Sequence, residues 1–351
     1  MDKNKSNQYR GRLSMIFLKN DYSLGAHPEV LKALVDNNET LCDSYCHDVF
    51  CTETTEQVRR LIGCETAEAH YFSGGTQTNK VALAAFLRPY EAVIAADSAH
   101  IGVHETGAIE ATGHKVIALP SVEGKITPEQ IEKVVAFHNF DQMVLPKLVY
   151  VSNTTEVGSV YTKAELAALY ACCQKLGLYF YIDGARMAMA LGATESGLTL
   201  SDYPKLCDAF YIGGTKCGAL FGELLLIIND ALKPAFRFMM RQNGALFAKG
   251  FLLGLQFAPL LKDGLYEKLG SHANAMAMAL AKGMAEKGYK FYYKPVSNQI
   301  FPIVDHAFAI RLAKDIAFET TYDNGDGTDT IRFVTSWATS QEEIDAALAL
   351  L

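Results

Sequence analysis

The chain has 351 residues, of which half are apolar and a fifth are charged. This balance is typical of a folded protein with a large core and excludes a disordered chain, which combines low hydrophobicity with high net charge. A net charge of −7 and a pI near 5.7 argue against nucleic-acid and anionic-membrane partners, since both require a basic surface.

The N-terminus and the cysteines bear on the compartment. Residues 1–14 are polar and basic without the apolar stretch of a secretory signal, so we interpret them as a loose polar leader. No apolar run approaches the roughly 18 residues of a membrane-spanning helix. Eight cysteines without paired C-x-x-C spacing favour reduced thiols, and we therefore expect a cytoplasmic protein.

Short apolar runs rich in Val, Ile, Tyr and Phe predict buried strands at 92–96, 115–119, 148–151, 178–182, 209–212 and 224–228. Helical segments separate many of them, which predicts an α/β fold with a mostly parallel sheet flanked by helices. The best-defined helix is 163–176. Thr162 and Glu165 form a capping box at its start, and Gly177 ends it.

A change of pattern near Gly270 predicts a second, smaller domain. We expect a large α/β domain at 15–269 and a smaller α+β domain at 270–351, which the N-terminal segment could also join. The smaller domain would begin with an Ala- and Met-rich helix at 272–287. The segment 323–329 has the composition of a calcium loop but lacks the glutamate at its twelfth position, so we predict a hairpin turn there.

Three motifs follow predicted strands or precede predicted helices, at the edge where open α/β sheets bind ligands. The first is SGGTQTN at 73–79. Its glycines leave backbone N–H groups free, and the following helix adds its positive end, so the motif suits a phosphate. It matches neither the dinucleotide fingerprint nor the Walker loop. Alone, it could equally be an ordinary turn and helix cap.

The second and third motifs add an acid and a lysine. Asp183 directly follows a buried strand, where a carboxylate needs a cation or a hydrogen-bond donor such as a pyridinium nitrogen. Lys216 lies in a glycine-flanked loop after a later strand, where burial can lower its pKa and allow a Schiff base. A phosphate cradle, an acid and a lysine in this order are what pyridoxal phosphate requires of a protein.

Several longer motifs carry a family resemblance. They are LKND at 18–21, SGGTQTN at 73–79, DSAHIGVHETGAIEATGH at 97–114, YIDGAR at 181–186, GGTK at 213–216, RQNG at 241–244 and IRFVTSW at 331–337. The sequence resembles the low-specificity L-threonine aldolase (β-eliminating lyase) family of fold-type-I pyridoxal-phosphate enzymes over nearly the whole chain. The resemblance implies the fold of those enzymes, a large domain with a smaller C-terminal one.

The resemblance also implies catalytic and binding roles. Lys216 would form the Schiff base with the cofactor, and Asp183 would hold the ring nitrogen protonated. His100 would stack on the ring face, and Arg186 would lie near the phenolic oxygen. The remaining cofactor contacts would come from Gly75, Thr76, Thr215 and, across a subunit boundary, Arg241. The substrate carboxylate would be bound by Arg332, with Asn20 beside it.

Ordinary structural explanations exist for these residues. Asp183 and Arg186 could simply pair with each other. His100 could be a core histidine with both ring nitrogens hydrogen-bonded. Arg332, on a predicted strand, could pair with a neighbouring acid, and Arg241 could belong to a solvated face.

The sequence departs from the family pattern at two places. Many relatives have Tyr-Gly-Asp where this chain has YCHD at 45–48, and bacterial low-specificity members carry a histidine that is missing from NTTEVG at 153–158. The group that contacts the substrate's β-hydroxyl is therefore open. Cysteines and a histidine cluster at 42–51, but their spacing fits no standard zinc site, so we expect no metal.

The implied reaction is cleavage of the Cα–Cβ bond of L-threonine, L-allo-threonine or a related β-hydroxy-α-amino acid to glycine and an aldehyde. Water held by His100 or Glu156 could take the hydroxyl proton. The alternatives are β-elimination or transamination with the same cofactor, a non-catalytic pyridoxal-phosphate-binding homologue, and a nicotinamide oxidoreductase, whose Gly-rich fingerprint is missing. We expect a homodimer or homotetramer with shared active sites, in contact through the apolar stretch 236–257.

Overall fold

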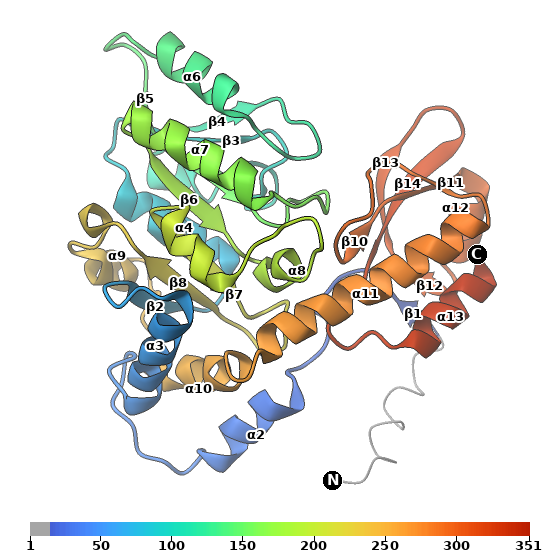
Figure 1. Cartoon of the computed structure of the whole chain (residues 1–351), viewed down its shortest axis with the longest axis horizontal. Helices are drawn as coiled ribbons and strands as arrows, with labels where there is room; N and C mark the ends of the chain where they lie inside the picture. Colours follow the sequence, from blue (N-terminus) through green and yellow to red (C-terminus); the bar gives the residue numbers. More distant parts are fainter. Residues whose placement is uncertain (1–14) are drawn as a thin grey trace.

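The computed structural model describes residues 15–351, so the predicted leader at 1–14 lies outside the described residues. Two sheets of different size are joined by the long helix α11, Leu265–Glu286 (Figure 1). Each sheet has a hydrophobic core of its own. None of the helices in residues 15–351 has the length and apolar character to cross a membrane.

The large sheet has seven strands in the order β2-β8-β7-β6-β5-β3-β4. They are β2 (Glu68–Phe72), β3 (Glu91–Ala96), β4 (Val116–Leu119), β5 (Leu145–Ser152), β6 (Tyr179–Asp183), β7 (Ala209–Gly213) and β8 (Glu223–Ile227). Strands β3 to β7 run parallel, whereas β8 is antiparallel to both β7 and β2. The predicted strands are confirmed. β2 was missed because His70 and Glu68, which contact each other, make its sequence polar.

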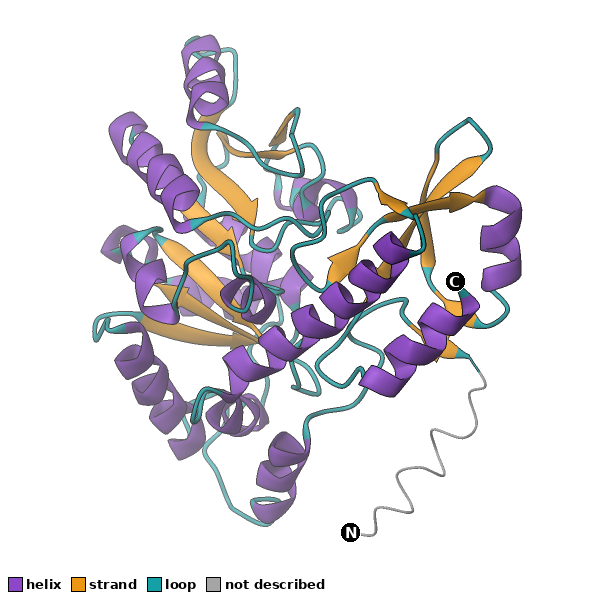
Figure 2. Ribbon diagram, turned by 45° about the vertical axis from the view of Figure 1, so that its right-hand side comes forward, coloured by secondary structure: helices purple, strands orange, loops and turns teal. Residues whose placement is uncertain are grey.

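Helices cover both faces of the large sheet (Figure 2). Every residue of β3, β7 and β8 is buried as a result. The helices are α2 (Pro28–Asp36), α3 (Val49–Ile62), α4 (Gly75–Phe86), α5 (His100–Val103), α6 (Pro128–Phe137), α7 (Lys163–Leu176), α8 (Met187–Leu191), α9 (Phe236–Gln242) and α10 (Phe251–Leu260). Short 3-10 turns lie at Glu110–Thr112, Leu200–Lys205 and Asp230–Leu232.

Helix α7 has the predicted bounds and the predicted ends. The amide of Glu165 donates to Thr162 Oγ1 at 3.2 Å, and the amide of Thr162 donates to Glu165 Oε2 at 2.7 Å. Gly177 ends the helix in the left-handed region with φ of 68°. The capping box and the glycine stop are thus confirmed.

The small sheet is antiparallel and packs beside α11. Its strands are β9 (Lys290–Phe291), β10 (Gln299–Ile300), β11 (Pro302–Asp305), β13 (Glu319–Asp323) and β14 (Thr328–Val334), and the helices α12 (His306–Leu312) and α13 (Gln341–Leu350) complete this part. Near the N-terminus, β1 (Ile16–Phe17) pairs in parallel with β12 (Ile316–Ala317), and Leu18 lies in the same core. The predicted hairpin turn is confirmed between β13 and β14.

The helix predicted at 272–287 begins earlier, at Leu265, because Gly270 does not interrupt it. A Cβ at Gly270 would lie 2.1 Å from the backbone oxygen of Ala188, so the glycine lets α11 approach α8 closely. Gly270 is therefore inside a helix whose residues contribute to both hydrophobic cores. The division into domains at 269/270 stays a prediction.

Gly270→Ala should lower the free energy of unfolding by about 1–3 kcal/mol, because a methyl group cannot fit against rigid backbone. Gly283→Ala is the matched control in the same helix. Its new methyl group would meet only the side chain of Leu348, which can move. Both variants gain about 1 kcal/mol of helix propensity. Urea unfolding checks the difference, and equal stability of the two variants would contradict this account of the α8–α11 contact.

Candidate active site

The candidate site is a cavity of about 360 Å³ at the edge of the large sheet where its parallel strands end. Loops that follow β2, β3, β5, β6 and β7 all contribute to its lining. The structure brings together around this cavity Gly75, Thr76, His100, Asp183, Arg186, Thr215 and Lys216. Asn20, Arg241 and Arg332 are not among its lining residues.

One wall of the cavity is the start of α4. Gly74 is the N-cap residue, and no side chain caps the helix. Ser73, Gly74, Gly75 and Thr76 line the cavity, so the first N–H groups of a twelve-residue helix lie beside it. A Cβ at Gly75 would lie 3.0 Å from the Tyr211 hydroxyl. Because Gly74 and Gly75 have no side chains to cover the backbone and no side chain caps the helix, its free N–H groups suit an anion such as a phosphate.

Asp183 lies at the end of β6 with its carboxylate fully hydrogen-bonded. Tyr211 and the amide of Ala185 donate to Oδ1, and Tyr150 and Asn79 donate to Oδ2. Burial alone would raise the pKa of Asp183, but the charge of His100 and these hydrogen bonds outweigh it and lower the pKa. The side chain is therefore an anion that can pair with a protonated ring nitrogen, which would replace one of the present donors.

Asn79 joins two buried carboxylates of the site. Its Nδ2 donates to Asp183 Oδ2 at 2.9 Å and to Glu105 Oε1 at 2.8 Å. The same oxygen of Glu105 lies 2.8 Å from His100 Nδ1, and the Glu105 side chain is fully buried. Glu105 thus fixes the imidazole of His100. Because His100 is about one third exposed, it is not a core histidine.

Arg186 pairs with Asp21 rather than with Asp183. Its Nε and Nη2 donate to the Asp21 carboxylate at 2.7 and 3.1 Å, and Asn298 donates to the same carboxylate at 2.9 Å. Burial acts to raise the pKa of Asp21, but the Arg186 and Lys216 charges outweigh it and the pKa is lowered. The ion pair considered between Asp183 and Arg186 does not form, which leaves Asp183 available to the cavity.

Lys216 is buried beside the same charges. Burial, followed by repulsion from Arg186, lowers the pKa of its amine, while Asp21, Asp183 and Glu223 act in the opposite sense. Within residues 15–351 the amine donates no hydrogen bond, and the centroid of the Tyr22 ring lies 6.0 Å from Nζ. A buried amine with a lowered pKa is the form that reacts with a carbonyl group.

Glu223 is a buried carboxyl group next to Thr215. The Gly214 amide donates to its Oε2 at 3.0 Å, and the Thr215 hydroxyl donates to its Oε1 at 2.8 Å. Burial, the largest influence, raises the pKa of Glu223 to about 8, although Thr215 and Lys216 act to lower it. The group is therefore largely protonated at neutral pH, which reduces its repulsion of an anion nearby.

Glu156 and His104 also line the cavity. Ser152 donates to Glu156 Oε1 at 2.6 Å, and the backbone amide of His100 donates to the same oxygen at 2.9 Å. Burial raises the pKa of Glu156. His104, one helical turn beyond His100, also lines the cavity.

The remaining predicted residues lie elsewhere. Asn20 Oδ1 accepts hydrogen bonds from the Tyr22 amide and the Ser23 hydroxyl, in a separate cavity. Arg241 is exposed, with its guanidinium 4.4 Å from the ring centroid of Tyr45.

Arg332 lies on β14, where its Nη2 bonds the cross-strand carboxylate of Glu319 and its buried Nε has no partner among residues 15–351. Glu319 is thus the neighbouring acid with which Arg332 could pair for purely structural reasons. Nη1 of the same guanidinium donates to Gln299 Oε1 at 3.5 Å.

Sequence reasoning missed several residues of the site, namely Asp21, Asn79, His104, Glu105, Tyr150, Tyr211 and Glu223. Four of these lay inside motifs that had been singled out: Asp21 ends LKND, Asn79 ends SGGTQTN, and His104 and Glu105 follow His100 in the next motif. The tyrosines were interpreted as core because they lie in apolar strands. Only the side-by-side placement of β5, β6 and β7 reveals that their hydroxyls meet Asp183.

An uncapped helix start, a buried anion and a buried free amine in one cavity fit pyridoxal phosphate, whose phosphate, ring nitrogen and aldehyde need these three groups. The fold is that of fold-type-I pyridoxal-phosphate enzymes. An aspartate aminotransferase from Thermus thermophilus shares it with a TM-score of 0.71 at 16% identity, over 99% of this chain and 94% of that one. The predicted fold class is confirmed.

Comparison with known proteins places the chain within this class. The family model described as beta-eliminating lyase matches residues 32–307. The low specificity L-threonine aldolase of Pseudomonas sp. (strain NCIMB 10558) is 31% identical over 338 residues, which cover 94% of this chain and 95% of that protein. A solved structure of Leishmania major threonine aldolase has a TM-score of 0.94 at 46% identity, over 95% of this chain and 98% of that one.

The chain therefore belongs to the beta-eliminating lyase family, as the resemblance predicted. It is a lyase that depends on pyridoxal phosphate. The roles of individual residues stay predictions.

Glu223→Gln should flatten the pH dependence of stability. Because the folded-state pKa of about 8 exceeds the ordinary value of 4.5, the folded protein binds more protons and loses stability as pH rises across this interval. Between about pH 5.5 and 8.5 we expect the wild type to lose at least about 1.4 kcal/mol more than the variant, the equivalent of one pKa unit. Thermal unfolding measures this.

The exposed substitution Glu132→Gln is the control for a change of charge. Equal pH dependence in wild type and Glu223→Gln would mean that Glu223 titrates normally.

Proposed function

We propose that this protein cleaves the Cα–Cβ bond of L-threonine, L-allo-threonine or a related β-hydroxy-α-amino acid to glycine and an aldehyde. The observation that carries the proposal is the convergence of Lys216, Asp183 and the uncapped start of α4 on one cavity. The relatives named as threonine aldolases, similar over nearly the whole chain, support the substrate class.

The cofactor, when bound, withdraws electrons from Cα of the substrate and so permits the bond at Cα to break. Lys216 would hold the cofactor, and the Asp183 anion would keep its ring nitrogen protonated. Gly75, Thr76 and Thr215 would bind its phosphate. His100, fixed by Glu105, would lie against the ring.

Arg332 is the proposed partner of the substrate carboxylate. The charge of Arg332 influences the pKa of His104, and the charge of Arg186 influences the pKa of Arg332. Because His104 and Arg186 line the cavity, Arg332 lies near it although it is not a lining residue. A substrate carboxylate would displace Glu319 or Gln299 from the guanidinium. Fixing the carboxylate sets which bond at Cα stands perpendicular to the cofactor ring and therefore which bond breaks.

β-Elimination from an amino acid with a leaving group on Cβ is the second candidate, because the matching family model carries that description. The products separate the two reactions. Elimination yields a keto acid and ammonia, whereas the aldol cleavage yields glycine and an aldehyde.

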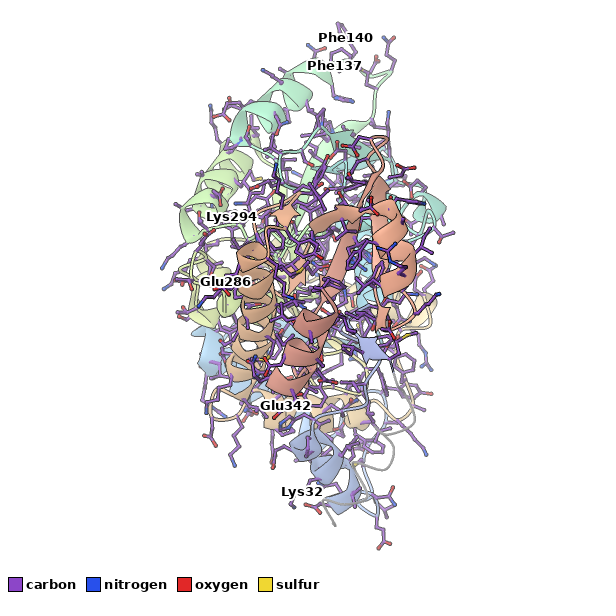
Figure 3. The ribbon with its side chains drawn as sticks, turned by 90° about the vertical axis from the view of Figure 1, so that its right-hand side faces the viewer. Lys32, Phe137, Phe140, Glu286, Lys294 and Glu342 are labelled. Carbon is purple, nitrogen blue, oxygen red and sulfur yellow. The ribbon has the colours of Figure 1, made fainter. Side chains whose placement is uncertain are left out.

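We further propose a homodimer or homotetramer with shared active sites. Helix α2 lies at one end of the molecule, where Figure 3 labels Lys32, and exposes Leu31 and Val35, while Phe137 and Phe140 are exposed at the opposite end. Within the stretch 236–257, most apolar side chains belong to the core of the subunit itself, and Phe238 is 79% exposed.

A cytoplasmic location is also proposed. It rests on the eight cysteines, all of which are free thiols in the structure.

The purified protein loaded with pyridoxal phosphate should release equal amounts of glycine and acetaldehyde from L-threonine, from L-allo-threonine or from both. Lys216→Ala should abolish this release and the visible absorbance of the lysine-bound cofactor together, because no other amine of the cavity can replace it. Lys205→Ala, outside the cavity, is the matched control. A Lys216→Ala protein that retains both signals would remove the assignment.

Arg332→Lys should raise the KM for L-threonine about 10- to 100-fold, because a charged hydrogen bond of about 1.5–3 kcal/mol loses its geometry. The absorbance of the bound cofactor should not change. Arg311→Lys, on the surface of α12, serves as the control. An unaltered KM would instead support the ordinary cross-strand pair of Arg332 with Glu319.

A further inference from the structure

Aldol cleavage requires a base at the β-hydroxyl of the substrate, and most candidate bases of the cavity are already engaged. The two oxygens of Asp183 accept four hydrogen bonds, and those of Glu223 accept two. Glu156 accepts from Ser152 and from the His100 amide, both at Oε1. Donors already occupy oxygens of each of these carboxyl groups, which makes the histidines the less engaged candidates.

Two histidines remain, and they differ in their contacts. His100 Nδ1 is held by Glu105. Within residues 15–351 neither ring nitrogen of His104 has a hydrogen-bond partner, and its side chain is exposed to the cavity and to solvent. Because His104 follows His100 by four residues across α5, the rings lie on the same side, with centroids 5.5 Å apart.

The charges around His104 favour its neutral form. Burial first, and then the positive charges of His100, Arg332 and Lys216, lower its pKa, while Glu319 acts in the opposite sense. A neutral imidazole with two free nitrogens is a proton acceptor at neutral pH.

The position of His104 agrees with this role. The charges of Lys216 and Arg332 both influence the pKa of His104. Lys216 marks the place to which the Cα of the substrate must bind, and Arg332 is the proposed partner of the substrate carboxylate. A β-carbon attached to a Cα held between those two groups lies within the same region of the cavity. His104 would thus supply, from another loop, the imidazole that the stretch 153–158 lacks.

We propose, on the basis of the function proposed above, that His104 is the catalytic base at the substrate's β-hydroxyl. The hydroxyl proton passes to an imidazole nitrogen, and the O–H electron pair becomes the second bond of the aldehyde carbonyl. The Cα–Cβ bond breaks, and its electron pair stays on Cα with the electron-withdrawing cofactor. Cα then takes up one proton, His104 gives up the one that it accepted, and glycine leaves with no net change in protons.

His104→Gln tests this in the protein loaded with pyridoxal phosphate. We expect kcat for L-threonine to fall about 100-fold. The decline of kcat/KM toward acid pH should also be lost, because the imidazole whose protonation would cause it has been removed. The absorbance of the bound cofactor and the dissociation constant for glycine should stay within about twofold of wild type, since glycine has no β-hydroxyl. Added imidazole should restore part of the lost rate.

His138→Gln, at the end of α6 and outside the cavity, is the matched control, and Glu156→Gln tests the competing base. The proposal is overturned if His104→Gln keeps the wild-type kcat and the decline of kcat/KM toward acid pH, or if Glu156→Gln alone removes that decline. It is also overturned if His104→Gln changes the dissociation constant for glycine by as large a factor as kcat. Wild-type protein that cleaves neither threonine isomer would instead contradict the proposed function itself.

Discussion

The buried carboxylate of Asp183 is the interaction on which the rest of the site depends. A carboxylate removed from water without partners costs several kcal/mol. Here four donors offset that cost, and they come from β5, β7, α4 and the loop after β6 itself. The anion is stable only while these elements keep their order in the sheet. The order of the strands therefore determines whether Asp183 can remain charged.

A second set of charges links the two parts of the molecule. Asp21, in the N-terminal segment that packs against the small sheet, binds Arg186 from the large sheet and Asn298 from the loop before β10. This ion pair keeps Arg186 away from Asp183 and places positive charge near Lys216. This ion pair therefore brings a residue from near the N-terminus beside the cavity that the large sheet forms.

The protonation states of the cavity follow from burial and from neighbouring charge. Asp183 and Asp21 stay ionised because donors and cations surround them, whereas burial raises the pKa of Glu223 and Glu156. Because Glu223 is largely protonated at neutral pH, the cavity can accept a phosphate without strong repulsion from that side chain. Burial and neighbouring positive charge lower the pKa of His104, which favours the neutral imidazole that the proposed base requires.

The sequence by itself determined the family, the cofactor, the strands of the large sheet except β2, and the ends of α7, because these depend on local motifs and on the period of apolar residues. It could not reveal that the hydroxyls of Tyr150 and Tyr211 donate hydrogen bonds to Asp183, since both residues occupy apolar strands and reach Asp183 only across the sheet. Nor could it show that Arg186 pairs with Asp21, 165 positions away. Partner choice among buried charges is decided by distances in space, and only the tertiary structure sets those distances.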